Sequence, residues 1–488
     1  MALTDLASAA NGRPDAGTLA EQIRGLPSTV LSEEERESAA GMIPDDLDRR
    51  LRAANRSSSA EWKAIKTRDD WQRFRDDKLR RLRKAVGPLP DRPAGLRLKV
   101  TATFNGDGYR IQNLVFQSRP GLWVTANLYL PAEPAESMPG MLICHSHHTP
   151  KEHGELQDMD MTWARRGCLV LVPDLLGHGE RRQHPFVTEA DYPKPFRVGR
   201  QDYYFRYDLG MQLALAGESL MGWFVWDIHS RVTVLTLQPG VDQKRIVILG
   251  AVAGGGFLPW TIVGAIALRP FIYAHEFAWN RPHDPVWRRL QSIWSLHGAE
   301  DKLAAVRGRG SVNGRPPEST HCTHIGLVHR RSIHPAFRRW FDIDVTENHE
   351  YSARLESDRL RCITPAAKDA LKPRRICDLL CEITAARIVS APSRQDRLSD
   401  ADRREQLRQA WSAVLGRPRP CNTLEARVVA ADDVRTIYKP AVQSYRGADS
   451  ADKLVIQETT KPASRWLLQR LCGPSVGDNW TIEWEEEM

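Results

Sequence analysis

The spacing of apolar and polar residues changes character along the chain. Residues 1–58 are polar and interrupted by Gly and Pro, and we expect them to be loosely ordered with short helices. Residues 59–86 place Trp, Ile, Phe and Leu at helical spacing, with Arg and Lys opposite, which predicts one amphipathic helix. After a proline-rich linker, residues 96–131 alternate apolar and polar side chains around an Asn105–Gly108 turn, which predicts antiparallel strands.

From Gly140 the apolar residues instead form short continuous runs. Runs at 140–144, 167–174, 244–250 and 269–276 have the pattern of strands that are buried on both faces. Helical patterns separate these runs, including a long amphipathic stretch over 207–237. This alternation predicts an α/β fold with a doubly wound, mostly parallel sheet.

We expect three regions. Residues 1–95 form a mostly helical and partly loose extension, and residues 96–345 form the α/β domain. Residues 346–488 form a helical extension. Within it, the segment from Leu424 weakly resembles the hairpin pattern at 96–117, and we interpret it as the start of a truncated second unit of the same kind.

The composition and net charge indicate to which broad class of protein the chain belongs. With 41% apolar and 27% charged residues, the chain is typical of soluble globular proteins. No run of eighteen apolar residues occurs, so no membrane span is expected. The net charge of +8 is spread along the chain and gives no reason to expect nucleic-acid binding, and the basic cluster at 80–84 is expected to face water. The N-terminus lacks the features of a secretory signal, which favours the cytoplasm.

Ligands bind such sheets at the carboxyl ends of the strands, so the residues that follow each run are candidates for chemistry. The run ending at Cys144 is followed by His145, Ser146, His147 and His148. Three interpretations stay open: an oxyanion loop that offers backbone N–H groups, a histidine metal site, or a strand-end turn without chemistry. Two residues of the T-H-S-H-x-D-H metal signature are absent here. A metal site is therefore not our first expectation here.

The run at 244–250 leads into a glycine-rich bend. Gly250 and Gly254 stand at the two glycines of a G-x-S-x-G nucleophile elbow, and Val252 then occupies the nucleophile position. The bend fits the motif, but valine has no nucleophilic atom. Ser219, in a helical stretch, is interpreted as structural.

Two further residues are candidates for a catalytic acid and base. Asp284 precedes a predicted helix, where it is either the acid of a triad or an N-cap, and Glu276 is a second choice. His321, in a loop before the next predicted helix, stands where a triad base is found, with His324 second.

Taken in chain order, these motifs resemble those of bacterial α/β-hydrolases of the acetyl xylan esterase and cephalosporin deacetylase type. The resemblance covers residues 96–341 and rests on NLYLP, LICHSHH, VPDLLGHGERRQHPF, GESLMGWFVWD, KRIVILG and THCTHIGLVHRR. It implies a doubly wound sheet and cofactor-free hydrolysis of an acyl ester of a small molecule or carbohydrate. It also implies that His321 is the base, Asp284 the acid and His145–His147 the oxyanion loop.

The chain departs from that family in two ways. Val252 replaces the nucleophile, and only 18 residues, 251–268, separate two strands between which the family has a further strand. One parallel crossover needs about a dozen residues, so we expect a strand to be missing. Three functions follow: a carboxylic ester hydrolase, an inactive homologue that binds ligands, or a metal-dependent hydrolase using His145, His147 and His148.

Overall fold

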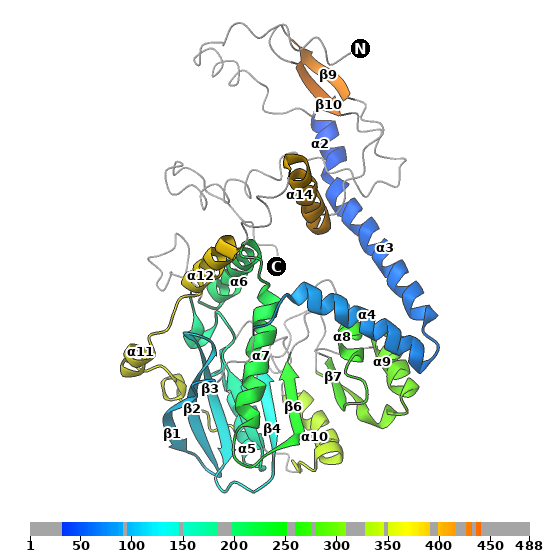
Figure 1. Ribbon diagram of the computed structural model, residues 1–488. Helices are drawn as coiled ribbons and strands as arrows, with labels where there is room; N and C mark the ends of the chain where they lie inside the picture. The colour runs from blue at the N-terminus through cyan, green and yellow to red at the C-terminus, as the bar shows by residue number, and fades with distance from the viewer. Residues whose placement is uncertain are drawn as a thin grey trace. The chain divides into compact units, whose positions relative to one another are not determined.

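The chain divides into two compact units in a computed structural model (Figure 1). Residues 64–396 form one unit, and residues 1–63 with 397–488 form the other. The structure describes residues 32–90, 95–145, 150–183, 198–250, 259–275, 280–308, 327–345, 350–390, 399–415, 426–431 and 436–440. The predicted division at residues 95 and 345 stays a prediction.

The described part of the smaller unit contains five regular elements. They are α2 (Glu33–Ala40), α3 (Met42–Ala64, whose last residue belongs to the other unit), α14 (Asp400–Leu415) and the strands β9 (Ala426–Ala431) and β10 (Thr436–Pro440). β9 and β10 pair in antiparallel fashion. That pairing agrees with the hairpin pattern from Leu424, but the truncated second unit stays a prediction.

The larger unit is built around a six-stranded sheet with the order β1-β2-β3-β5-β4-β6. Its strands are β1 (Lys99–Asn105), β2 (Tyr109–Arg119), β3 (Leu122–Pro131), β4 (Met138–Cys144), β5 (Leu169–Pro173) and β6 (Val241–Gly250). β1, β2, β3 and β5 are successively antiparallel, whereas β5, β4 and β6 are parallel. The antiparallel and parallel runs lie where the two sequence patterns predict them.

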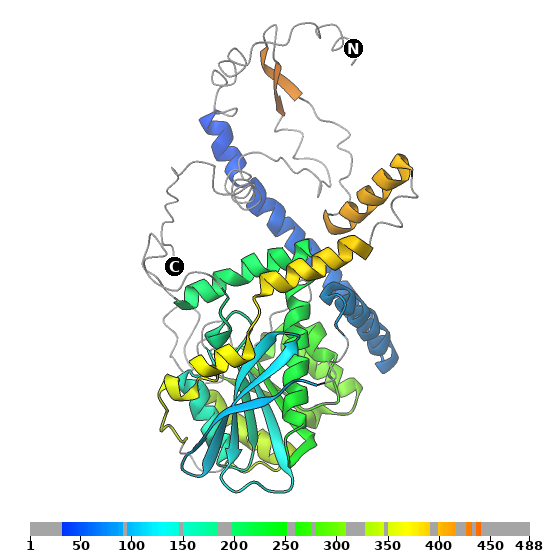
Figure 2. The ribbon, with the colours of Figure 1, turned by 60° about the vertical axis from the view of Figure 1, so that its left-hand side comes forward.

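Helices cover both faces of this sheet. α7 (Leu220–Thr236) packs Val234 and Leu235 against Leu142 and Leu171, and Figure 2 shows it running along the strands. On the opposite face, α5 (Gly154–Ala164) and α10 (Leu327–Phe341) contribute to a second apolar core. These apolar layers confirm the doubly wound α/β fold.

A second, two-stranded sheet contains β7 (Phe271–His275) and β8 (Leu303–Arg307) in parallel. The helix α9 (Pro285–Leu296) lies between them in the chain. Within the described ranges, no hydrogen-bonded ladder joins β6 to β7, and α8 (Pro259–Gly264) is the one regular element between them. A deleted strand stays a prediction. β8 has no counterpart among the strands predicted from the sequence.

The prediction of one continuous helix over 59–86 is wrong, because two helices occupy this range. α3 ends at Ala64, and α4 (Arg68–Val86) begins after Thr67. The Thr67 side chain accepts a hydrogen bond from the N–H of Asp70, and the Asp70 carboxylate accepts one from the N–H of Thr67. This capping box starts a new helix, because both side chains satisfy N–H groups that would otherwise have no partner.

The predicted amphipathic stretch over 207–237 is likewise two helices. α6 (Val198–Leu215) and α7 are separated by Gly217, which has a φ of 72°, and by Ser219. The Ser219 side chain accepts a hydrogen bond from the N–H of Gly222 and caps α7. The structural role expected for Ser219 is confirmed.

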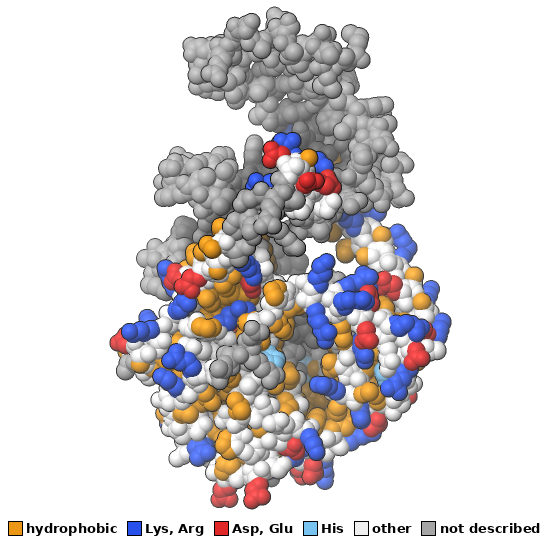
Figure 3. All heavy atoms as spheres, viewed as in Figure 1, with side chains coloured by type: hydrophobic (Ala, Val, Ile, Leu, Met, Phe, Trp, Pro, Cys, Tyr) orange, Lys and Arg blue, Asp and Glu red, His pale blue; other side chains and the backbone are white. Residues whose placement is uncertain are grey.

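Charged residues on α4 face water, as expected from the sequence. The side chains of Arg80 and Arg81 are 75% and 65% exposed, and both pair with Asp77. Figure 3 shows Lys and Arg in blue among acidic side chains over the part of the surface where α4 and α9 lie. No helix among the described residues is long and apolar enough to cross a lipid bilayer.

Candidate active site

The carboxyl ends of β4, β5 and β6 lie at one edge of the sheet. Cys144, the last residue of β4, is the register partner of Gly250, the last residue of β6. The loops that follow these two strands therefore begin side by side. Seven predicted candidates, Ser146, His147, His148, Val252, Gly254, Glu276 and His321, lie outside the described residues, as does His324, and their roles stay predictions.

His145 is the described member of the predicted oxyanion loop. It is 4% exposed, and its Nε2 atom accepts a hydrogen bond from the backbone N–H of Leu175 over 3.0 Å. Its ring also meets that of His178 edge to face, with centroids 6.0 Å apart. These contacts connect the loop after β4 to the loop after β5, which gives His145 a structural role.

Asp284 is the N-cap of α9. Its Oδ1 atom accepts a hydrogen bond from the N–H of Val286 over 2.8 Å. Pro285 occupies the first position of the helix, where a missing N–H costs nothing. Of the two roles considered from the sequence, the structure shows the cap, and the role as catalytic acid stays a prediction.

Cys144 is the register partner of Gly250, the last described residue before the glycine-rich segment. Burial raises the pKa of this thiol, although the Arg231 guanidinium opposes the shift. A cysteine nucleophile requires a lowered pKa, because the thiolate is the reactive form. Cys144 therefore lacks the environment of a nucleophile that could replace the absent serine.

The metal interpretation concerned His145, His147 and His148. In the part of the chain that the structure describes, no three His, Cys, Asp or Glu side chains are arranged to hold a metal ion. His145 itself bonds to the backbone of Leu175. The metal-dependent hydrolase stays an untested alternative, because His147 and His148 lie outside the described residues.

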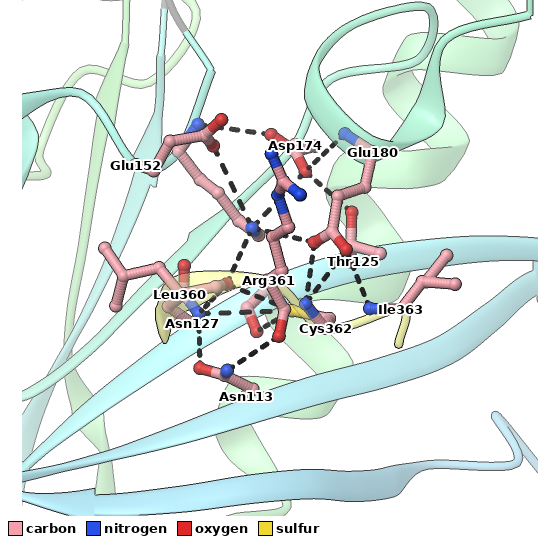
Figure 4. A network of polar contacts seen from close by, with 12 residues as sticks. Asn113, Thr125, Asn127, Glu152, Asp174, Glu180, Leu360, Arg361, Cys362 and Ile363 are labelled. Atoms are coloured by element: carbon pink, nitrogen blue, oxygen red, sulfur yellow. Dashed lines mark hydrogen bonds and ion pairs between the residues drawn. The ribbon is translucent and has the colours of Figure 1, made fainter. Parts of the chain in front are cut away.

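A buried ion-pair network occupies this edge of the sheet (Figure 4). Lys151 is fully buried, with its Nζ atom 2.9 Å from Oε2 of Glu180 and 3.7 Å from Oδ2 of Asp174. Burial alone would lower the pKa of Lys151, but the surrounding acidic groups raise it above its usual value. The lysine is thus charged, and its charge is balanced by the carboxylates around it.

Asp174 immediately follows β5 and connects three segments. Its carboxylate accepts hydrogen bonds from the hydroxyl of Thr125 over 2.7 Å and from the N–H groups of Lys151 and Glu180. Burial would raise the pKa of Asp174, but Lys151, His145 and these hydrogen bonds hold it below its usual value. Asp174 is therefore an anchored carboxylate, unsuited to accept a proton near neutral pH.

The same network binds a backbone segment from far along the chain. The Nζ atom of Lys151 donates to the carbonyl oxygen of Leu360, and the carboxylate of Glu180 accepts from the N–H groups of Cys362 and Ile363. The Asn127 side chain also donates to the carbonyl of Leu360. Residues 360–363 are thereby fixed against the strands of the sheet.

The apolar run at 167–174 ends in Asp174, but no sequence pattern pointed to Lys151 or to residues 360–363. A lysine in a polar loop is normally exposed, so the sequence offered no signal that this one is buried. The segment at 360–363 has no periodic pattern that would dock it on a sheet. Lys151, Asp174 and Glu180 all have partners within the network, which suits these three residues to hold the segments in place.

Comparison with known proteins gives structural likeness without sequence matches. No protein-family model matches the chain, and no curated protein sequence matches it. The methylesterase BT1017 is similar in structure, with a TM-score of 0.47 and 15% identity, over 67% of this chain and 78% of that chain.

Two further structures are similar over smaller parts of this chain. A putative acetyl xylan esterase from Bacteroides fragilis NCTC 9343 has a TM-score of 0.41 and 12% identity, covering 57% of this chain and 93% of that one. An acetyl xylan esterase from Paenibacillus sp. R4 has a TM-score of 0.29 and 16% identity, covering 58% and 98%. The strand order, the parallel β5-β4-β6 core and the helices on both faces give this chain an α/β-hydrolase-like fold.

Proposed function

We propose that the chain is a carboxylic ester hydrolase of the acetyl xylan esterase type, acting on an acyl ester of a small molecule or carbohydrate. The observation that carries the proposal is the register of β4 and β6, in which Cys144 lies opposite Gly250. Ester hydrolysis needs oxyanion donors and an attacking group at one carbonyl carbon. Residues 146–149 and 251–258 follow these two paired strand ends in the chain, and we infer that they supply these groups.

The residue roles follow the family resemblance. His321 is the general base, Asp284 orients it, and backbone N–H groups around His147 stabilise the developing oxyanion. Because Val252 offers no nucleophile, His321 takes a proton from a water molecule, whose oxygen attacks the acyl carbon. The proton then passes to the departing alkoxide, and the carboxylic acid and the alcohol are released. This route uses no cofactor.

Hydrolysis of p-nitrophenyl acetate by the purified full chain tests the proposal. General-base catalysis contributes about 10²–10⁴-fold, so His321→Ala should lower the rate by about a hundredfold or more. His283→Ala is the control, because His283 is an exposed histidine that contacts Asn280. Equal rates for wild type and His321→Ala would remove His321 from the mechanism.

A second candidate function is an inactive hydrolase homologue that binds its ligand without turnover. The valine at the nucleophile position favours it. Val252→Ser should then create esterase activity where the wild type has none, because the bend would present a hydroxyl. Ala251→Ser is the matched control. Wild-type turnover well above the buffer rate would contradict this candidate, and no turnover by either protein would contradict the hydrolase.

A further inference from the structure

A second buried charge cluster lies on the α7 side of the same edge. Asp227 and Arg231 belong to α7, and Arg181 is the last residue of the short helix Gly179–Arg181 that follows β5. The three residues are 2%, 1% and 4% exposed. Nη1 of Arg181 lies 2.6 Å from Oδ2 of Asp227, and Nη2 of Arg231 lies 3.6 Å from the same oxygen.

A third arginine, Arg119, is the last residue of β2 and contacts α7. The Arg119 guanidinium lies 4.2 Å from the ring centroid of Trp223 on α7. Burial lowers the pKa of Arg119, and the charges of Glu218 and Asp227 oppose that shift. Glu218 is itself paired with Arg387. Arg181 and Arg231 therefore share Asp227 as counter-charge, and the main counter-charge of Arg119, Glu218, is shared with Arg387, which leaves an excess of positive charge.

Several donors in the cluster are also unsatisfied. Nε and Nη1 of Arg231 and Nη2 of Arg181 are buried without a nitrogen or oxygen acceptor among the described residues, and the Cys144 sulfur beside Arg231 is a weak acceptor. A buried donor without an acceptor is unfavourable, and so is a buried charge without a counter-ion. Trapped water would satisfy the donors but would leave the charge uncompensated. An anion would satisfy both.

We propose that Arg119, Arg181 and Arg231 form a binding site for a small anion whose oxygens are of the carboxylate or phosphate type. Guanidinium groups are suited to these oxygens because they present several fixed N–H donors and stay charged. Nη1 of Arg181 and Nη2 of Arg231 both donate to the carbonyl oxygen of Asp174, which follows β5. The site thus lies at the edge where the candidate loops begin, and its ligand is a free anion or the acid group of a larger molecule.

Calorimetric titration of the full chain with sodium phosphate and, separately, sodium acetate tests this site without any substrate. Its outcome is therefore independent of esterase activity. Each titration is made against sodium chloride at the same ionic strength. We expect saturable binding of at least one anion and a rise in melting temperature with its concentration. Tighter binding of acetate would assign the site to carboxylates, and tighter binding of phosphate to phosphates.

Three variants locate the binding. Arg231→Lys keeps the positive charge but removes the Nε and Nη1 donors, and Arg119→Gln removes the more accessible guanidinium. Each should weaken binding at least tenfold. Arg245→Lys is the control, because Arg245 lies in the middle of β6 and pairs with Asp242 rather than with Asp227.

Two results would overturn the site: no saturable binding by the wild type, or unchanged affinity in both Arg231→Lys and Arg119→Gln. If Arg231→Lys fails to fold, the wild type and Arg119→Gln decide the question.

Discussion

The Nζ atom of Lys151 lies 2.9 Å from Oε2 of Glu180, so a buried ion pair connects the loop after β4 to the loop after β5. Both loops emerge from parallel strands at the edge where the candidate oxyanion loop begins. Leu360, bound by the same lysine, adds a segment that is separated by 209 residues from Lys151. The position of this edge thus depends on contacts that are distant in sequence.

Removal of Lys151 should destabilise the fold strongly. Lys151→Met leaves the carboxylates of Asp174 and Glu180 buried without their counter-charge, which costs about 3–5 kcal/mol of unfolding free energy. Urea denaturation followed by circular dichroism measures the change. Arg375→Gln is the control, because Arg375 and Asp378 form an exposed pair with side chains 75% and 47% exposed. Similar unfolding free energies for both variants would show that the buried network contributes little.

Asp160 should make stability fall as the pH rises. It is fully buried, and neither of its carboxylate oxygens has a hydrogen-bond partner among the residues described. Burial raises the pKa of Asp160 well above its usual value, although the charge of Arg330 opposes the shift. The native state therefore holds this proton more tightly than the unfolded chain does. Above the unfolded pKa of about 3.9, each further pH unit costs about 1.4 kcal/mol until the folded-state pKa is reached.

Asp160→Asn removes this titration. The variant should unfold at a higher urea concentration than the wild type at pH 7, and the difference should vanish near about pH 3, where the aspartic acid is protonated in both states. Asp358→Asn, at a carboxylate that is 80% exposed, is the control and should unfold at about the same urea concentration as the wild type at pH 7. An Asp160→Asn variant less stable than wild type at pH 7 would contradict the assignment.

Gly222 should tolerate no side chain. A Cβ atom built on it lies 2.3 Å from the carbonyl oxygen of Val86, where the end of α4 meets the start of α7. Gly222→Ala must separate these helices, and overpacking of this kind costs about 1–3 kcal/mol.

Gly210→Ala is the matched control, because its Cβ would lie 3.6 Å from Leu220 at ordinary contact distance. Alanine is favoured over glycine in a helix by about 1 kcal/mol, so this variant should be more stable than wild type. Thermal unfolding compares the two variants, and a loss of stability in Gly210→Ala equal to that in Gly222→Ala would refute the steric explanation.

Asp284 can be tested for its two roles separately. Asp284→Ala loses the cap of α9 and should lose about 0.5–2 kcal/mol of unfolding free energy. Asp284→Asn keeps a capping oxygen and should retain wild-type stability. If Asp284 also orients His321, both variants should lower the rate of p-nitrophenyl acetate hydrolysis. Full activity in Asp284→Asn would leave the cap as the one supported role.

The sequence determined the elements that depend on local pattern. The continuous apolar runs form β4, β5, β6 and β7, and the alternating runs form β1, β2 and β3. Strands were predicted well because the spacing of apolar residues depends directly on whether one or both faces of a strand are buried. Helix boundaries were predicted less well. A polar capping residue such as Thr67 interrupts a helix without interrupting its apolar period.

Only the tertiary structure decided which polar residues are buried and what they bind. Asp284 caps a helix, His145 accepts a backbone hydrogen bond, and Lys151 lies fully buried among carboxylates. Burial of a charge is stable when its partners are brought to it, and here those partners come from segments separated by tens to hundreds of residues. The hydrophobic pattern records which face of an element is buried, but it contains no information on which distant groups compensate a buried charge.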